Sequence, residues 1–171
     1  MHLPAWAGMG IRFWMSDISE HLPLLKEYAK DKEVLELGVR SGESTRSFLE
    51  SAAHVTSLDR DDCSGVSSSK KWLFIKGDSL LARIDGQYGI IFIDTSHRFR
   101  DTLLELRKYS PMLARGGAII LHDANPPFTS KYIRMRGGVL KAILTFMNEQ
   151  PCTWQMTYIE NNNGLAILRR R

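Results

Sequence analysis

Residues 34–45 read Val34-Leu35-Glu36-Leu37-Gly38-Val39-Arg40-Ser41-Gly42-Glu43-Ser44-Thr45. The stretch begins as a short apolar strand, passes through a turn with glycines at Gly38 and Gly42, and leads into a polar helix start. Because glycine has no Cβ, such a turn can adopt positive φ and let a ligand approach the backbone, while the next helix directs free N–H groups toward it. The pattern predicts a ligand-binding turn between a strand and a helix.

Glu36 distinguishes this turn from the dinucleotide-binding type. The dinucleotide fingerprint G-x-G-x-x-G places a pyrophosphate at the helix N-terminus, where a neighbouring carboxylate would repel it. The spacing here is E-x-G-x-x-x-G, with the acidic residue at the end of the strand. A carboxylate beside bare glycine backbone favours a ligand with a cationic, amino-acid-like end.

Strand-like and helical runs alternate on both sides of this turn. Strands are expected at Glu33–Leu37, His54–Leu58, Trp72–Ile75, Gly89–Ile93 and Ala118–Leu121, and helices at Ser44–Ala53, Arg98–Tyr109 and Val139–Asn148. Continuous apolar strands that alternate with helices indicate an α/β fold with a parallel sheet covered on both faces. Two further strand-like runs, Thr153–Ile159 and Leu165–Leu168, flank a turn-rich linker and predict an antiparallel C-terminal hairpin.

Length and composition predict one globular domain over residues 1–171. The chain is 43% hydrophobic and 25% charged, which suits a packed core and argues against disorder. We expect a helical N-terminal segment over residues 1–31, with a helix start at Asp17 and Glu20, and a cofactor-binding core over residues 32–171. No apolar run approaches the roughly 20 residues of a membrane span. Residues 1–6 lack the basic start of a signal peptide, so we expect a cytoplasmic protein.

Cysteines and charge add little about function. Cys63 and Cys152 lie outside any metal-ligand spacing, so we interpret them as free thiols in a reducing compartment. The net charge of +4 is partly concentrated in basic clusters such as Arg169-Arg170-Arg171. Clusters of this kind are usually solvated faces, although an anionic substrate stays open.

Acidic residues follow the expected strands, at the edge where open α/β sheets bind ligands. Glu36 ends the first strand, and Asp59 ends the second. Asp59 lies roughly 20 positions beyond the glycine turn, which suits a carboxylate that accepts hydrogen bonds from both hydroxyls of a ribose. The later strands are followed by Asp78 with Ser79, by Asp94 and by Asp123. A single aspartate at a strand end is commonly a turn former or helix cap. Acidic residues after all five expected strands instead favour a shared ligand site.

With these residues the chain resembles class I S-adenosylmethionine-dependent methyltransferases, in particular the macrocin-type and catechol-type O-methyltransferases. The resemblance runs from about Lys32 to the C-terminus and implies a Rossmann-like, doubly wound sheet of seven strands, mostly parallel, with the last strand antiparallel. It also implies a set of cofactor contacts, with S-adenosylhomocysteine as the product. These contacts are Glu36, Gly38 and Gly42 at the methionine part, Asp59 at the ribose, Asp78 and Ser79 near the adenine, and Asp94 beside the cofactor.

Methyl transfer to a hydroxyl requires a positioned nucleophile and removal of its proton. Asp94, Asp123 and Asn125 offer hard oxygen ligands that suit Mg²⁺, and such a metal would acidify and orient a bound hydroxyl. His97 lies three residues after Asp94 and is a candidate base near neutral pH, as the resemblance to macrocin-type enzymes also implies. His122 stands where some metal-dependent relatives have an acidic residue, and we interpret it as a hydrogen-bonded histidine at a strand end.

The leading hypothesis is therefore an S-adenosylmethionine-dependent O-methyltransferase that acts on a small molecule. Nucleic-acid methylation is an alternative, because Asn125-Pro126-Pro127-Phe128 matches the N-P-P-[YF] motif of enzymes that grip a flipped base, although it follows the fifth strand rather than the fourth. A third hypothesis is a non-catalytic cofactor-binding module that works with a partner. Little sequence precedes the first strand to form a substrate lid, so a homo-oligomer also stays open. Trp6, Phe13 and Trp14 offer apolar surface there without identifying the acceptor.

Overall fold

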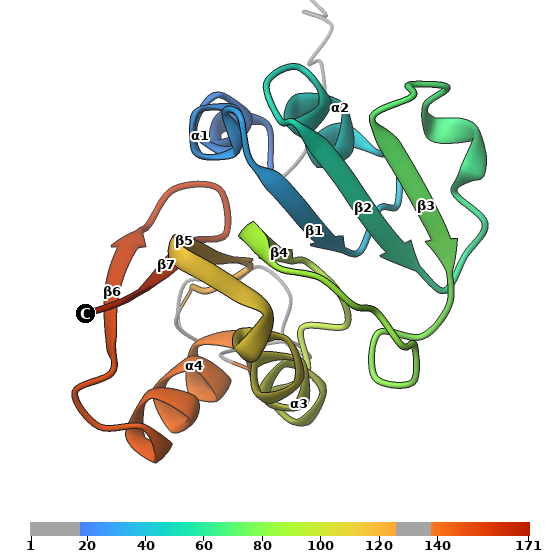
Figure 1. The fold of residues 1–171 in the computed structure, drawn as a ribbon. Coiled ribbons are helices and arrows are strands. Elements are labelled where there is room, and N and C mark those ends of the chain that lie inside the picture. Colours follow the sequence, from blue (N-terminus) through green and yellow to red (C-terminus); the bar gives the residue numbers. More distant parts are fainter. Residues whose placement is uncertain (1–17, 126–137) are drawn as a thin grey trace, which may run out of the picture.

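The computed structural model describes residues 18–125 and 138–171. Seven strands form one sheet in the order β3-β2-β1-β4-β5-β7-β6 (Figure 1). The strands are β1 Glu33–Leu37, β2 His54–Asp59, β3 Trp72–Lys76, β4 Tyr88–Ile93, β5 Leu113–His122, β6 Trp154–Ile159 and β7 Leu165–Arg170. Strands β1 to β5 run parallel, and β7 lies antiparallel between β5 and β6. The predicted Rossmann-like fold with its antiparallel C-terminal hairpin is confirmed.

Two helices cover each face of this sheet. Helices α1 (Leu22–Ala29) and α2 (Glu43–Leu49) pack on one face, and α3 (Phe99–Tyr109) and α4 (Gly138–Glu149) pack on the other (Figure 1). Neighbouring strand residues alternate between the two cores, as Ile90 packs with α1 and α2 while Ile91 packs with α3 and α4. The strands are apolar on both faces because each face is covered by helices.

Some element boundaries differ from the sequence-based expectation. Helix α2 ends at Leu49 instead of Ala53, because the backbone of Ser51 and Ala53 bonds to the segment between α1 and β1. Strand β5 starts at Leu113 instead of Ala118, since Leu113 pairs with Tyr88 across a register shift. Residue Asp17, the expected helix start, lies outside the described residues. None of the helices in the described ranges is long and apolar enough to cross a membrane.

The strand order determines where along the sheet a ligand-binding crevice forms. The chain runs outward from β1 to β3, returns to the other side of β1 as β4, and continues outward to β5. Such a reversal opens a crevice beyond the carboxyl ends of the two central strands, which are β1 and β4 here. The residues that follow β1 and β4 therefore meet at this crevice.

Candidate functional site

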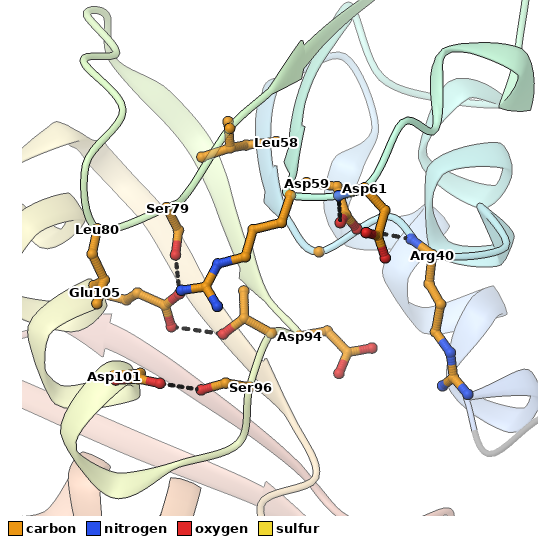
Figure 2. Close-up of a pocket in the computed structure, with 14 residues that line it drawn as sticks. Arg40, Leu58, Asp59, Asp61, Ser79, Leu80, Asp94, Ser96, Asp101 and Glu105 are labelled. Atoms are coloured by element: carbon orange, nitrogen blue, oxygen red, sulfur yellow. Dashed lines mark hydrogen bonds between the residues drawn. The ribbon is translucent and has the colours of Figure 1, made fainter.

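A cavity of about 440 Å³ lies beyond the carboxyl ends of β1 to β4 (Figure 2). Among the predicted cofactor residues, Gly38, Asp59, Ser79 and Asp94 line it. Glu36, Gly42 and Asp78 are not part of the lining. The structure therefore brings together one residue from each of the first four strand ends.

Gly38 is the point of closest approach between the two central strand ends. Its φ is +93°, and a Cβ there would lie 2.0 Å from the carbonyl oxygen of Asp94. Gly42 has a φ of +76°, and its Cβ would lie 2.1 Å from a methyl of Val66. Both positions require glycine, because other residues rarely adopt this φ and a side chain would collide. The turn can thus lie against the cavity.

Asp59 fixes the backbone of the same turn. One of its carboxylate oxygens accepts hydrogen bonds from the amides of Val39 at 2.7 Å and Arg40 at 3.0 Å. Its other oxygen accepts a bond from the Asp61 amide at 2.9 Å. A carboxylate has about four acceptor positions, so Asp59 can hold the turn and still accept from a ligand.

Glu36 lies beneath the turn, away from the cavity wall. Its carboxyl group is fully buried and accepts hydrogen bonds from the hydroxyls of Ser44 at 2.5 Å, Thr45 at 2.7 Å and Ser57 at 2.5 Å. Burial, followed by the nearby charge of Asp94, raises the pKa of Glu36 to about 7. The carboxyl group of Glu36 thus contacts the first turn of α2 and β2, and its contact with a methionine moiety stays a prediction.

Asp78 is bonded to two residues that line the cavity. Its two carboxylate oxygens bond to the Arg60 guanidinium at 2.7 Å and to the Leu80 amide at 2.8 Å. The neighbouring Ser79 does line the cavity, and its hydroxyl donates to Glu105 of α3 at 2.5 Å. Of the two residues expected near the adenine, Ser79 lines the cavity and Asp78 does not, and both roles stay predictions.

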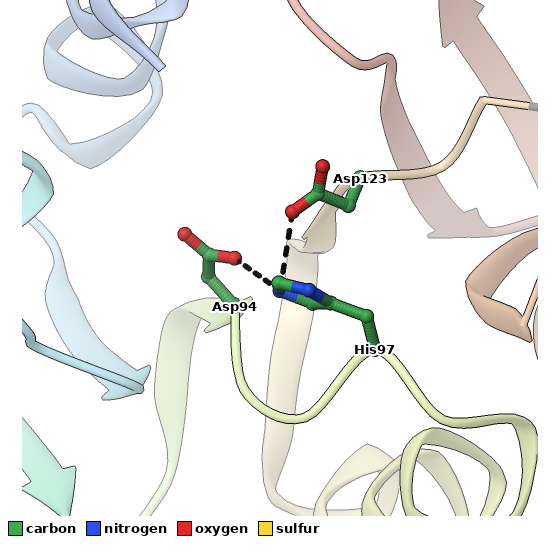
Figure 3. A group of neighbouring side chains, drawn as sticks. All are labelled: Asp94, His97 and Asp123. Atoms are coloured by element: carbon green, nitrogen blue, oxygen red, sulfur yellow. Dashed lines mark hydrogen bonds and ion pairs between the residues drawn. The ribbon is translucent and has the colours of Figure 1, made fainter. Parts of the chain in front are cut away.

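Beside the cavity, Asp94 and Asp123 converge on His97 (Figure 3). The Nε2 atom of His97 lies 2.8 Å from Asp94 Oδ1 and 3.2 Å from Asp123 Oδ2. The buried His122 directs Nδ1 toward the same two oxygens, at 3.6 Å and 3.4 Å. His97 and Asp123 both have positive φ, 56° and 54°. Such strained non-glycine backbone is typical of functional sites.

The charges in this group stabilise one another. Burial opposes a charge on His122, but hydrogen bonds to Asp123 and Asp94 raise its pKa to about 10. Burial likewise opposes a charge on His97, and the bond and charge of Asp94 raise its pKa. The two histidines hold the pKa of Asp94 well below its usual range despite burial. At neutral pH the group therefore contains a buried imidazolium, His122, beside two carboxylates.

Asn125, the third predicted metal ligand, contacts β6 and the loop between β6 and β7. Its side-chain oxygen accepts a hydrogen bond from the Tyr158 hydroxyl, and its backbone amide donates to Asn163 at 2.9 Å. Instead, one ligand atom each from Asp94, His97 and Asp123 lie within 4.8 Å of one another. Residues 126–128 of the N-P-P-F motif lie outside the described residues.

Sequence reasoning missed two acidic residues of α3 that line the cavity, Asp101 and Glu105. Asp101 accepts a hydrogen bond from Ser96 at 2.7 Å, and Glu105 accepts from Ser79 and Thr95. A signal was available for Glu105, because it falls on the same helical stripe as the apolar, buried Leu106 and Tyr109. A charged side chain on the buried face of a helix needs a hydrogen-bond or charge partner, so its position in the sequence indicates a polar site inside the protein.

Comparison with known proteins supports the predicted class. Residues 35–124, just over half of the chain, match the Methyltransferase domain family. The chain therefore belongs to this family. Its fold and family confirm the expectation from the sequence that it is a class I S-adenosylmethionine-dependent methyltransferase. A comparison with curated protein sequences finds no match.

Solved structures share the fold at low sequence identity. A Staphylococcus aureus protein provisionally described as a caffeoyl-CoA O-methyltransferase has a TM-score of 0.70 and 21% identity, over 89% of this chain and 83% of that one. Cofactor-bound Rv0187 from MTB has a TM-score of 0.73 and 17% identity, over 94% and 83%. The N-methyltransferase NodS of Bradyrhizobium japonicum WM9, in complex with S-adenosylhomocysteine, has a TM-score of 0.66 and 15% identity, over 94% and 91%. These structures include both O- and N-methyltransferases, so the fold leaves the acceptor atom open.

Proposed function

We propose that this protein transfers the methyl group of S-adenosylmethionine to a hydroxyl group of a small molecule, with His97 as the base. One observation carries the proposal: Asp94 belongs both to the cavity lining and to the group that holds His97. A base and a cofactor cavity that share a residue can act on the same reacting centre. An oxygen acceptor is favoured because an imidazole base is needed chiefly where a hydroxyl must lose its proton.

The cavity suits the cofactor in size and in chemistry. Its volume of about 440 Å³ lies within the range usual for small-molecule sites. Gly38 and Asp94 lie side by side in the cavity lining, and we assign the methionine part to this end of the cavity. We assign the ribose hydroxyls to Asp59 and the adenine end to Ser79. Glu36 then acts indirectly, by fixing the start of α2 behind the glycine turn.

The residues Asp94, His97, Asp123 and His122, called the catalytic group below, are arranged to take up a proton. When bound, S-adenosylmethionine supplies an electrophilic methyl group on a sulfonium. In its neutral form, His97 donates its Nε2 proton to the carboxylates of Asp94 and Asp123, so Nδ1 is the nitrogen that can accept the acceptor hydroxyl's proton. The two carboxylates then stabilise the imidazolium. His122 donates toward the same carboxylates and keeps them in place.

The charges of the Asp94, His97 and Asp123 group do not favour Mg²⁺ binding. Asp94 and Asp123 could each offer one carboxylate oxygen, and Mg²⁺ often binds only one or two carboxylates. The His122 imidazolium, however, lies 3.6 Å and 3.4 Å from those oxygens and already compensates their charge. We therefore expect EDTA to leave turnover unchanged. A catalytic metal would supply several kcal/mol, so chelation would then abolish turnover and Mg²⁺ would restore it.

Two measurements test the proposed function. Calorimetry with S-adenosylhomocysteine should show binding to the wild type, and the absence of binding would contradict the proposal. Turnover should be measured with radiolabelled S-adenosylmethionine and a panel of catechols and phenols. Replacing a general base typically lowers turnover by about 10²- to 10⁴-fold, which we expect for His97→Asn with little change in S-adenosylhomocysteine affinity. His54→Gln, at the half-buried start of β2, is the matched control and should keep full turnover.

Nucleic-acid methylation is less well supported. Its motif residue Asn125 bonds to Tyr158 of β6 and does not line the cavity. Binding to RNA or DNA that weakens steeply with salt would revive it. A cytoplasmic location, a homo-oligomer and a non-catalytic role with a partner stay predictions from the sequence.

A further inference from the structure

His21 is a buried histidine that the proposed mechanism leaves without a role. It ends the short 3₁₀ helix η1 (Ser19–His21), directly before α1, and only 2% of the residue is exposed. Its ring packs edge to face against the ring of His122, with 5.4 Å between the centroids. The start of the described chain therefore contacts the catalytic group through this pair of rings.

Hydrogen bonds define the protonation state of His21. The side chain of Asn161 donates from Nδ2 to Glu20 at 2.6 Å, so its Oδ1, 3.2 Å from His21 Nε2, is an acceptor and Nε2 carries a proton. Burial lowers the pKa of His21, and the charge of His122 acts in the same direction, so the ring is neutral at neutral pH. Nδ1 has no hydrogen-bond partner among the residues that the structure describes. A phenyl ring in this place would lose only the bond to Asn161.

The His122 ring depends on packing for its position. Its Nδ1 lies 3.6 Å from Asp94 Oδ1 and 3.4 Å from Asp123 Oδ2, longer than the about 2.7–3.2 Å that is usual for such hydrogen bonds. On its other nitrogen, Nε2 lies 3.0 Å from the carbonyl oxygen of Asn162. Because the contacts with the carboxylates are long, the residues packed against the ring help to hold it in place, and His21 is one of them.

The loop between β6 and β7 has attachments besides its bond to His21. Asn161 also donates to Glu20, and its carbonyl oxygen accepts a bond from the Gly164 amide at 2.9 Å. The carbonyl oxygen of Asn163 accepts a bond from the Asn125 amide at 2.9 Å. Loss of the bond from His21 would therefore leave the loop connected. The packing of the His21 ring is then its main contribution at the catalytic group.

We propose that His21 is a positioning residue, whose ring keeps His122 in contact with the two carboxylates that hold the proposed base. The inference rests on the proposed function, because the residue that His21 supports belongs to the catalytic group. A smaller side chain at this position would leave a cavity beside the His122 ring. The ring could then turn away from the carboxylates, and the base would lose its fixed orientation.

Turnover of His21→Ala and His21→Phe tests the proposal. A displacement of about 1 Å can lower a rate by about 10²-fold, so we expect kcat of His21→Ala to fall by about 10- to 100-fold with KM and S-adenosylhomocysteine affinity unchanged. His21→Phe keeps the ring and should retain wild-type turnover. Leu25→Ala is the matched control, since it truncates a fully buried side chain of α1 in the core and should keep kcat per folded protein.

The pH profile separates positioning from a loss of stability. Burial and the charge of His122 both oppose a charge on His97. If His122 moves away in His21→Ala, the pKa of His97 rises, and the acid limb of kcat should shift to higher pH. The limb should stay in place in His21→Phe and in Leu25→Ala, because unfolding of part of the sample lowers the rate without changing this pKa.

A second measurement needs no acceptor substrate. Exchange of the His122 Nε2 proton with solvent can be followed by NMR, and it should be slow in the wild type because His122 is 1% exposed and bonds to the Asn162 carbonyl. His21→Ala should speed this exchange at least about tenfold through local opening, and His21→Phe should leave it slow.

Three outcomes would overturn the inference. They are wild-type kcat and slow exchange in His21→Ala, an equal loss in His21→Phe, or an equal loss of kcat in Leu25→Ala. Should His21→Ala not fold, His21→Leu replaces it, because leucine keeps much of the buried volume without a planar ring and should change kcat and exchange in the same direction. If the wild type methylates no acceptor, the proposed function fails, while proton exchange still decides the role of His21.

Discussion

Glu36, at the end of β1, connects three elements of the protein through its buried carboxyl group. Its carboxyl group joins β1 to β2 and to the first turn of α2 through the hydroxyls of Ser57, Ser44 and Thr45. A buried group of this kind is stabilised in its neutral form unless its hydrogen bonds compensate for lost hydration. The pKa of about 7 means that burial outweighs the three hydroxyl donors.

The raised pKa predicts a pH-dependent stability. An unfolded glutamate titrates near 4.5 and Glu36 in the folded protein near 7, so between these values the folded state binds more protons. The contribution of Glu36 to the free energy of unfolding is therefore fully present below pH 4.5 and is lost as the pH rises through 7. The free energy of unfolding of the wild type, relative to Glu36→Gln, should fall by about 3 kcal/mol over this window. Urea denaturation across the pH range measures it, and a pH-independent difference would contradict the prediction.

Gly38→Ala should damage both the fold and cofactor binding. The added methyl group would lie 2.0 Å from the Asp94 carbonyl, at a φ of +93°. We expect a loss of at least about 2 kcal/mol in the free energy of unfolding, and weaker binding of S-adenosylhomocysteine. Gly65→Ala is the matched control, because nothing lies within 4 Å of its Cβ position, and it should change stability by about 0.5 kcal/mol or less. Equal effects of the two substitutions would show that the turn tolerates a side chain.

Residues at strand ends could be predicted, but the direction of their side chains could not. Gly38, Asp59, Ser79 and Asp94 line the cavity because the pattern of strands fixes which residues follow them. Whether a carboxylate faces the cavity depends on nearby donors from other elements. Glu36 turns to the hydroxyls of α2, and Asp78 turns to Arg60. Local sequence does not encode such contacts.

The first residue of helix α4 packs against His97, the proposed base. This residue, Gly138, lies so close to His97 that a Cβ would stand 2.3 Å from the His97 carbonyl oxygen. The helix is anchored farther along by Phe146, which packs within the core and against Trp154 of β6, with ring centroids 5.4 Å apart. The packing of α4 therefore supports the strained backbone at His97.

Phe146→Ala should destabilise the protein by about 3–5 kcal/mol, because it removes a fully buried aromatic side chain from this anchor. Leu144→Ala is a control on the same helix, since Leu144 is 47% exposed, and we expect about 1 kcal/mol or less. Thermal and urea unfolding of both variants measure the difference. Similar losses would mean that the core face of α4 is assigned incorrectly.

Elements with strong apolar patterns were predicted more accurately than their ends. The expected helix Val139–Asn148 is found at Gly138–Glu149, because its buried residues recur at helical spacing. The end of α2 and the start of β5 depend on backbone bonds to distant segments, which the sequence pattern does not contain. Asp94, Asp123 and His97 could be grouped from the strand pattern, because they follow neighbouring strands, but the place of His122 beside both carboxylates depends on the folded chain.

At the scale of the whole molecule, the start of the described chain meets the loop between β6 and β7 beside His122. His21 near the start bonds to Asn161 of the loop between β6 and β7 at 3.2 Å. In the same loop, the Asn162 carbonyl lies 3.0 Å from His122 Nε2. The rings of His21 and His122 pack edge to face, 5.4 Å between centroids. The start of the chain, the hairpin and the catalytic group are therefore linked through His122.

Ligand binding to the cavity should stabilise the molecule as a whole. A ligand at 100 times its dissociation constant adds about 2.7 kcal/mol if it binds only the folded state. For a chain of 171 residues this corresponds to a rise in Tm of about 5–10 °C with S-adenosylhomocysteine. Asp123→Ala should keep this rise while losing turnover, because Asp123 contacts His97 and does not line the cavity. Differential scanning calorimetry measures both proteins, and loss of the rise in Asp123→Ala would place Asp123 in the cofactor site instead of the catalytic group.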